Sequence, residues 1–150
     1  MQRSNRHLAT ALAACTVAAG MALGFPSPAS AAGGCSGYGG AHTDVFGNTY
    51  GTTNCYAYTP GYIRYNGTNS GYLYAGTSWF VCQEKFPGIE NPPVGSARNN
   101  YWLYTQGDVG YSHSGWGWFP ATKISGGVNY GPVPGLHSCD DYPIWAFPYP

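Results

Sequence analysis

The sequence predicts a small all-β protein that is held together by disulfide bonds. Three observations point to this class: short aromatic runs with strand composition, frequent Gly and Pro turn signals between them, and no helical periodicity after residue 31. Aromatic residues make up 17% of the chain and charged residues only 8%, so tyrosine and tryptophan must supply much of the buried area. Many short strands joined by such turns argue for a small barrel or sandwich.

Residues 1–31 have the pattern of a secretory signal peptide. A basic start precedes an apolar run at 8–25, and Ala29-Ser30-Ala31 offers an A-x-A cleavage signature. The alternatives are a membrane anchor, for which the run has a suitable length, and a lipoprotein cleavage box that ends at Cys15. The prolines and the small-residue site favour cleavage. We therefore expect a secreted protein, extracellular or associated with the cell wall, with no membrane contact after cleavage.

Four cysteines follow this segment, and in an exported chain they favour two disulfides. None has the close C-x-x-C spacing of a zinc or redox site, so we expect no metal and no cofactor. The sequence alone permits three pairings. We favour the nested one, because Cys55 and Cys82 flank strands expected to be neighbours, and Cys35 and Cys139 lie on extensions that leave from nearby ends. The expected bonds are thus Cys35–Cys139 and Cys55–Cys82.

The rest of the chain divides into three segments of different composition. Residues 32–54 are rich in Gly, Thr and Asn, and we expect an extended arm held by Cys35, with a short strand near 45–46. Residues 55–128 carry the aromatic runs and the turns, and form the predicted barrel. Residues 129–150 form a tail rich in Pro, Gly and aromatic residues.

Alternation along the strands puts aromatic side chains on both faces. Along the run 115–121, Trp116, Trp118 and Pro120 share one face, and Phe119 lies on the other. A barrel of this size has one interior, which cannot hold every ring. Some rings must therefore be exposed, covered by the arm and the tail, or used in binding.

The tail is one candidate to cover these rings. Its proline-aromatic segments, YGPVPGL at 130–136 and YPIWAFPYP at 142–150, favour extended structure. Held near the barrel by Cys139, such a tail can lie in the domain's own aromatic groove, which would then be structural. The alternative is a loosely packed extension.

GWFPATKI at 117–124 resembles the glycine-aromatic-aliphatic-proline ending of SH3 domains, and NNYWLYTQGD at 99–108 resembles the tryptophan-bearing strand of the same fold. YIRYNGTNSGYLYAG at 62–76 is similar to the signature of bacterial SH3 domains, with Arg64 in the arginine position. The resemblance covers about residues 55–128. It implies an SH3-like barrel with a disulfide-tethered N-terminal arm and a Pro-rich C-terminal tail around it.

The resemblance also implies roles for single residues. Phe119 and Ile124 would face the core, and Pro120 would line the ligand groove. Tyr101 would take the place of the groove tryptophan, and Trp102 that of the second aromatic residue.

The chain departs from the SH3 pattern in two ways. Lys123 stands where proline-binding SH3 domains carry a groove tyrosine, and the acidic loop that reads basic proline-rich ligands is missing. We therefore do not expect recognition of proline helices. Bacterial SH3 domains more often bind peptides of the cell wall, a polymer that an exported chain would meet.

The candidate binding site is a cluster of rings with one acidic residue at its edge. A shallow aromatic groove suits small apolar or glycine-rich peptides. The alternative is that the rings form the core of an aliphatic-poor barrel. Asp108 would anchor a ligand amine, or else be a turn residue that bonds its own backbone. The candidates are Tyr101, Trp102, Trp116, Trp118, Pro120 and Asp108.

Charge and motif content argue against several classes. With four basic and six acidic residues after residue 31, no basic patch exists and we expect no nucleic acid partner. His42, His113 and His137 have no Ser or Cys partner in a recognisable motif, and all four cysteines can pair, so we expect no catalysis.

We therefore predict a secreted, monomeric, non-catalytic SH3-like module that binds cell-wall peptide. A second hypothesis is a small secreted inhibitor of an extracellular protease or other enzyme, which would present the loop EKFPGIENPPVG at 84–95 to a protein partner. A third is a structural surface protein with no discrete ligand.

Overall fold

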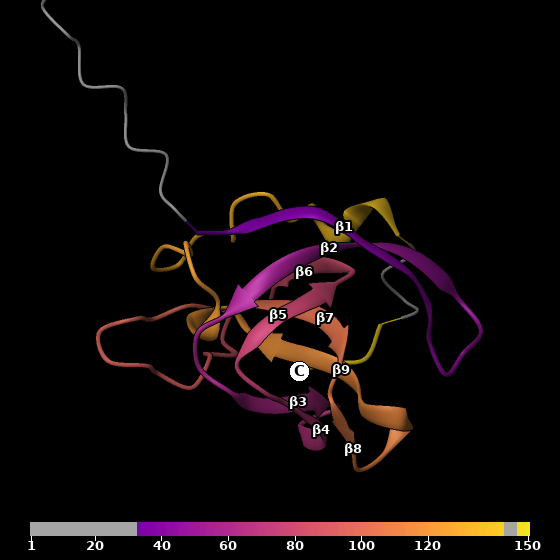
Figure 1. The fold of residues 1–150 in the computed structure, drawn as a ribbon. Helices are drawn as coiled ribbons and strands as arrows, with labels where there is room; N and C mark the ends of the chain where they lie inside the picture. Colours follow the sequence, from indigo (N-terminus) through magenta and orange to yellow (C-terminus); the bar gives the residue numbers. More distant parts are fainter. Residues whose placement is uncertain (1–32, 143–146) are drawn as a thin grey trace, which may run out of the picture.

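The computed structural model describes residues 33–142 and 147–150, and within these ranges it holds strands and short 3-10 turns but no α-helix. The strands form two antiparallel sheets (Figure 1). The all-β class and the presence of two disulfides are confirmed. The signal peptide predicted at 1–31 lies outside the described residues.

The first sheet has three strands, in the spatial order β1 (Cys35–Thr43), β2 (Thr49–Ala57) and β5 (Gly76–Phe80). The second has six, in the order β6 (Cys82–Lys85), β7 (Tyr101–Gln106), β9 (Trp116–Pro120), β3 (Gly61–Tyr65), β4 (Thr68–Leu73) and β8 (Val109–Gly110). The 3-10 turns are η1 (His113–Gly115), η2 (Ala121–Lys123) and η3 (Cys139–Asp141).

The segment expected to be an N-terminal arm, 32–54, instead forms most of a long hairpin. β1 pairs with β2 from Cys35 opposite Cys55 to the far end of both strands. The prediction of a short strand near 45–46 is wrong, because this stretch is the turn of the hairpin. There the Asp44 carboxylate accepts hydrogen bonds from the backbone N–H groups of Phe46 and Asn48, at 2.9 and 3.0 Å. β2 also runs through the boundary expected between residues 54 and 55.

The disulfide pairing predicted from the sequence is wrong. Neither Cys35–Cys139 nor Cys55–Cys82 forms, and the bonds are Cys35–Cys55 and Cys82–Cys139. The physical reason is the hairpin, whose register sets Cys35 directly opposite Cys55, with their Cα atoms 4.1 Å apart. The second bond then ties β6 to η3, and so fastens the C-terminal segment to the six-stranded sheet.

The two sheets are continuous through one strand that changes sheet at Val81. β5 pairs with β2, whereas β6, which follows directly, pairs with β7. A second link is the bridge between Ala57 at the end of β2 and Ile124 after η2. Figure 1 shows β1 and β2 on one side of the molecule and β3 and β4 on the other, with β7 and β9 between them.

Both faces of β7 and β9 are covered, which is one of the three outcomes that the alternation of their residues left open. The inner core holds Phe119, Ile124 and Leu103, so the core positions that the resemblance implied for Phe119 and Ile124 are confirmed. The opposite face carries a second cluster, here called the outer aromatic cluster. Its buried residues include Tyr50, Trp102, Tyr104, Trp116 and Trp118, with Phe86, Tyr142 and Phe147 packed against them.

Gly117 explains why a glycine separates the two tryptophans of β9. Its φ is +154°, and a Cβ there would lie 2.2 Å from the carbonyl oxygen of Arg64. A glycine is therefore required for β9 to approach β3, where Trp118 pairs with Arg64.

Candidate functional site

The two tryptophans of the predicted groove are buried. Trp116 is 2% exposed and Trp118 is 1% exposed. The Tyr104 ring lies between them, with its centroid 5.4 Å from that of Trp116 and 5.2 Å from that of Trp118. Both tryptophans thus belong to the outer aromatic cluster rather than to an open groove.

The end of the tail covers this cluster. The Phe147 ring lies 4.6 Å from that of Tyr104, and the Trp118 indole N–H donates to the carbonyl oxygen of Pro148. Two further hydrogen bonds join Tyr149 to Asn66. The Asn66 backbone N–H donates to the Tyr149 carbonyl oxygen at 2.7 Å, and the Tyr149 N–H donates to the Asn66 side-chain oxygen at 3.1 Å. Residues 147–149 of the tail therefore lie on the aromatic surface. This agrees with the alternative in which the tail docks on the domain, rather than the one in which it is a loosely packed extension.

The β1–β2 hairpin covers the same cluster from another side. The Tyr50 ring lies 6.4 Å from that of Trp116, and its hydroxyl donates to Asp44 at 2.8 Å. Burial, followed by the hydrogen bond to Asp44, raises the pKa of Tyr50 above its ordinary value. This hydroxyl therefore stays protonated and serves packing.

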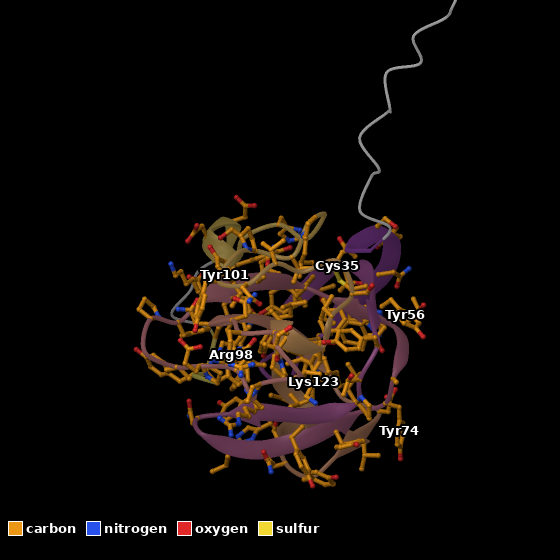
Figure 2. The ribbon with its side chains drawn as sticks, turned by 90° about the vertical axis from the view of Figure 1, so that its left-hand side faces the viewer. Cys35, Tyr56, Tyr74, Arg98, Tyr101 and Lys123 are labelled. Carbon is orange, nitrogen blue, oxygen red and sulfur yellow. A yellow bond between two sulfur atoms is a disulfide. The ribbon has the colours of Figure 1, made fainter. Side chains whose placement is uncertain are left out.

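Tyr101 and Asp108 lie apart from the tryptophans. Tyr101 packs against the inner core and lines a separate hollow with Leu136 and Asp140. Figure 2 shows Tyr101 well away from Lys123. Asp108 is exposed and accepts a hydrogen bond of 2.7 Å from the backbone N–H of Tyr74, which is distant in the sequence, so the bond is not the local turn contact that one alternative expected.

Trp102 and Pro120, the remaining predicted residues, do come together. They line a hollow of about 290 Å³ between the β3–β4 hairpin and η2, here called the β3–β4 hollow. Its other lining residues are Pro60, Gly61, Tyr62, Arg64, Asn69, Tyr72, Pro92 and Lys123.

A row of tyrosines continues from this hollow over the outer face of β3 and β4. Tyr62 and Tyr72 lie edge to face at 5.2 Å, and Tyr72 and Tyr74 at 5.5 Å. Tyr111 follows at 6.5 Å from Tyr62. Tyr62, Tyr74 and Tyr111 are each more than half exposed, and Figure 2 shows Tyr74 projecting from the ribbon. These four residues are called the tyrosine row below.

The tyrosine row was not predicted, although the sequence carries a signal for it. In GYIRY and GYLY, the tyrosines alternate with Ile63 and Leu73, which are buried. The register then sets Tyr62 opposite Tyr72. Alternation within a hairpin therefore puts both rings on the same face of β3 and β4.

Two cations border the β3–β4 hollow. The Arg64 guanidinium carbon lies 5.6 Å from the centroid of the Trp102 ring, which favours a cation–π contact. The Lys123 ammonium donates to the carbonyl oxygen of Pro60 at 2.8 Å. Gly61 makes room for this side chain, because a Cβ there would lie 2.7 Å from the Lys123 Cδ. Burial lowers the pKa of Lys123.

The histidines are engaged in stacking and in local hydrogen bonds. The His42 ring stacks on Trp79 at 3.6 Å, and the His113 ring stacks on Tyr65 at 3.7 Å. Within residues 33–142 and 147–150, no group of three His, Cys, Asp or Glu side chains is arranged to hold a metal ion. No helix in the described part of the chain is long and apolar enough to cross a membrane.

Comparisons with protein-family models, with curated proteins and with solved structures find no match to this chain. The candidate site is the β3–β4 hollow, with the tyrosine row and the two cations beside it.

Proposed function

We propose that the protein is a secreted, non-catalytic binding module, and that the β3–β4 hollow and the tyrosine row take a peptide of the cell wall. The observation that carries this proposal is the row of exposed tyrosines beside a concave site. Contiguous exposed apolar surface marks interaction sites on soluble domains. Tyrosine offers a large rigid contact area at low entropic cost, and its hydroxyl can bond a peptide backbone.

The proposal includes an SH3-like arrangement of the second sheet. Its support is that Phe119 and Ile124 are buried in the inner core, whereas Pro120 and Trp102 lie at the same hollow. Secretion is part of the proposal as well. Two disulfides suit an oxidising compartment outside the cell.

Co-sedimentation with insoluble peptidoglycan tests this function. Purified protein comprising residues 32–150 is compared with Tyr62→Ala and Tyr72→Ala, and we expect the wild type to sediment and both variants to lose most binding. Tyr38→Ala and Tyr130→Ala serve as matched controls, because these tyrosines are 73% and 52% exposed and lie outside the hollow. Absence of binding by the folded wild type would refute the proposal.

The loop at 84–95 supports the second candidate, an inhibitor of an extracellular enzyme. This loop is fastened to the body while its tip stays exposed: the Trp102 indole N–H donates to the Ile89 carbonyl at 3.0 Å, and the Thr122 N–H donates to the Asn91 side chain at 3.1 Å. A rigid presented loop costs little entropy on binding. Stoichiometric loss of activity of a secreted protease, relieved by Glu90→Ala, would favour this candidate over the first.

A further inference from the structure

The β3–β4 hollow gathers half of the basic residues of the folded chain. Residues 33–150 contain four basic and six acidic residues, a net charge of −2. Arg64 and Lys123 line the hollow, and none of the acidic residues that the structure describes does so. The hollow is thus a locally positive site on a chain with an excess of acid, and such a site favours an anionic ligand.

The charge of Lys123 is not balanced inside the described fold. Its ammonium has three donors, and the bond to Pro60 uses one of them. Burial is the one cause of the lowered pKa of Lys123, with no carboxylate acting against it. An anion placed in the hollow would supply that missing partner.

The Arg64 guanidinium is a second donor at the hollow. This group lies over the Trp102 ring, and Trp102 is itself fixed by its bond to the Ile89 carbonyl. A cation–π contact occupies none of the guanidinium N–H groups, so these remain able to donate. A carboxylate accepts from such N–H groups in a bidentate manner, and this makes arginine the usual residue for such recognition.

The remaining walls suit the body of a peptide. Tyr62, Tyr72, Pro92 and Pro120 are apolar surfaces, and Asn69 provides an amide. At about 290 Å³ the hollow lies at the small end of the range for ligand pockets. It therefore fits the end of a chain better than its middle, and the tyrosine row leads away from it over β3 and β4.

We propose, building on the function proposed above, that the β3–β4 hollow binds the free terminal carboxylate of a cell-wall peptide. Arg64 and Lys123 donate to the carboxylate. Tyr62 and Tyr72 pack against the residues that precede it.

The test is co-sedimentation with peptidoglycan that has been stripped of phosphate-bearing polymers. One sample of this stripped polymer is then left untreated, and in the other the carboxylates are converted to amides. We expect wild-type protein to bind the untreated polymer, and to bind the amidated polymer with an affinity at least about tenfold lower. Arg64→Gln and Lys123→Gln should show the same loss on untreated polymer. Arg64→Lys keeps the charge and should recover part of the binding.

Arg98→Gln and Lys85→Gln are matched controls, since each removes the same charge from outside the hollow. Both should bind like the wild type, and near-ultraviolet circular dichroism checks that every variant is folded. Equal binding to amidated and untreated polymer, undiminished in Arg64→Gln, would overturn the carboxylate assignment and leave the binding function standing. Binding that disappears once the phosphate polymers are removed would overturn it too, and failure of the wild type to sediment with any preparation would contradict both proposals.

Discussion

Among single residues, Glu84 carries the clearest electrostatic penalty. Its Oε2 atom is buried with no hydrogen-bond partner in the described part of the chain, while Oε1 accepts from the Lys85 N–H at 3.1 Å. Burial raises the pKa of Glu84. The hydrogen bond from the Lys85 N–H lowers this pKa in part, and repulsion by Asp140 raises it further. The ionised carboxylate is therefore less favourable in the folded state than in the unfolded chain.

A pH dependence follows for Glu84→Gln. Because the folded pKa is raised, the folded state holds the proton more tightly, and this contribution to stability is lost as the pH rises through the folded pKa. At neutral pH the variant should be more stable than the wild type, by less than about 1 kcal/mol because the group is only half-buried. The difference should shrink below the ordinary pKa of glutamate. Urea unfolding at neutral and acid pH measures it, and a variant less stable at neutral pH would contradict the assignment.

At the scale of elements, the C-terminal segment completes the outer face of the sheet. Phe147 packs against Tyr104 and Trp118, and the Cys82–Cys139 bond fixes the chain shortly before it. The sequence predicted that the rings of β9 alternate between faces, because alternation is a local property of a strand. It left open what covers Trp116 and Trp118, since the cover comes from Tyr50 and Phe147, far away in the chain.

Phe147→Ala tests this packing. Removing the ring should lower the free energy of unfolding by about 2 kcal/mol, less than for a fully buried phenylalanine, and should shift tryptophan emission to the red as water reaches Trp118. Thermal unfolding and fluorescence measure both effects. Tyr149→Ala is the matched control, because its side chain is 67% exposed and its backbone bonds to Asn66 remain. Unchanged emission and stability in Phe147→Ala would mean that the segment is not docked.

At the scale of the whole molecule, the two disulfides close loops of different length. Cys82–Cys139 spans 57 residues and Cys35–Cys55 spans 20. By the chain-entropy relation these bonds contribute about 4 and about 3 kcal/mol respectively. The pairing was not predictable from spacing, because it depends on the register of β1 with β2, a non-local property that Gly- and Thr-rich strands signal weakly.

The prediction is that replacing Cys82 and Cys139 together by serine destabilises the protein more than replacing Cys35 and Cys55. Denaturant unfolding of the two double variants gives the comparison. Peptide mapping of an unreduced digest should recover a Cys35–Cys55 peptide. Recovery of Cys35 joined to Cys139 would refute this pairing.

The sequence also predicted part of the proposed binding surface and missed the rest. Trp102 and Pro120 were named through the SH3 resemblance, and they do line the β3–β4 hollow. Tyr62 and Tyr72 were not predicted to line it, because their exposure depends on how β3 and β4 pair and on which face the inner core occupies. Local alternation indicates that two faces differ, whereas the tertiary fold decides which of them meets solvent.

The central claim is that the ligand-binding face of this molecule is the β3–β4 hollow with its tyrosine row. Titration of isotopically labelled protein with a soluble cell-wall peptide that ends in a free carboxylate, followed by amide chemical shifts, tests it most directly. We expect shifts concentrated at Tyr62, Arg64, Tyr72 and Lys123. Shifts confined to Trp116 and Trp118, or no shifts at saturating peptide, would contradict it.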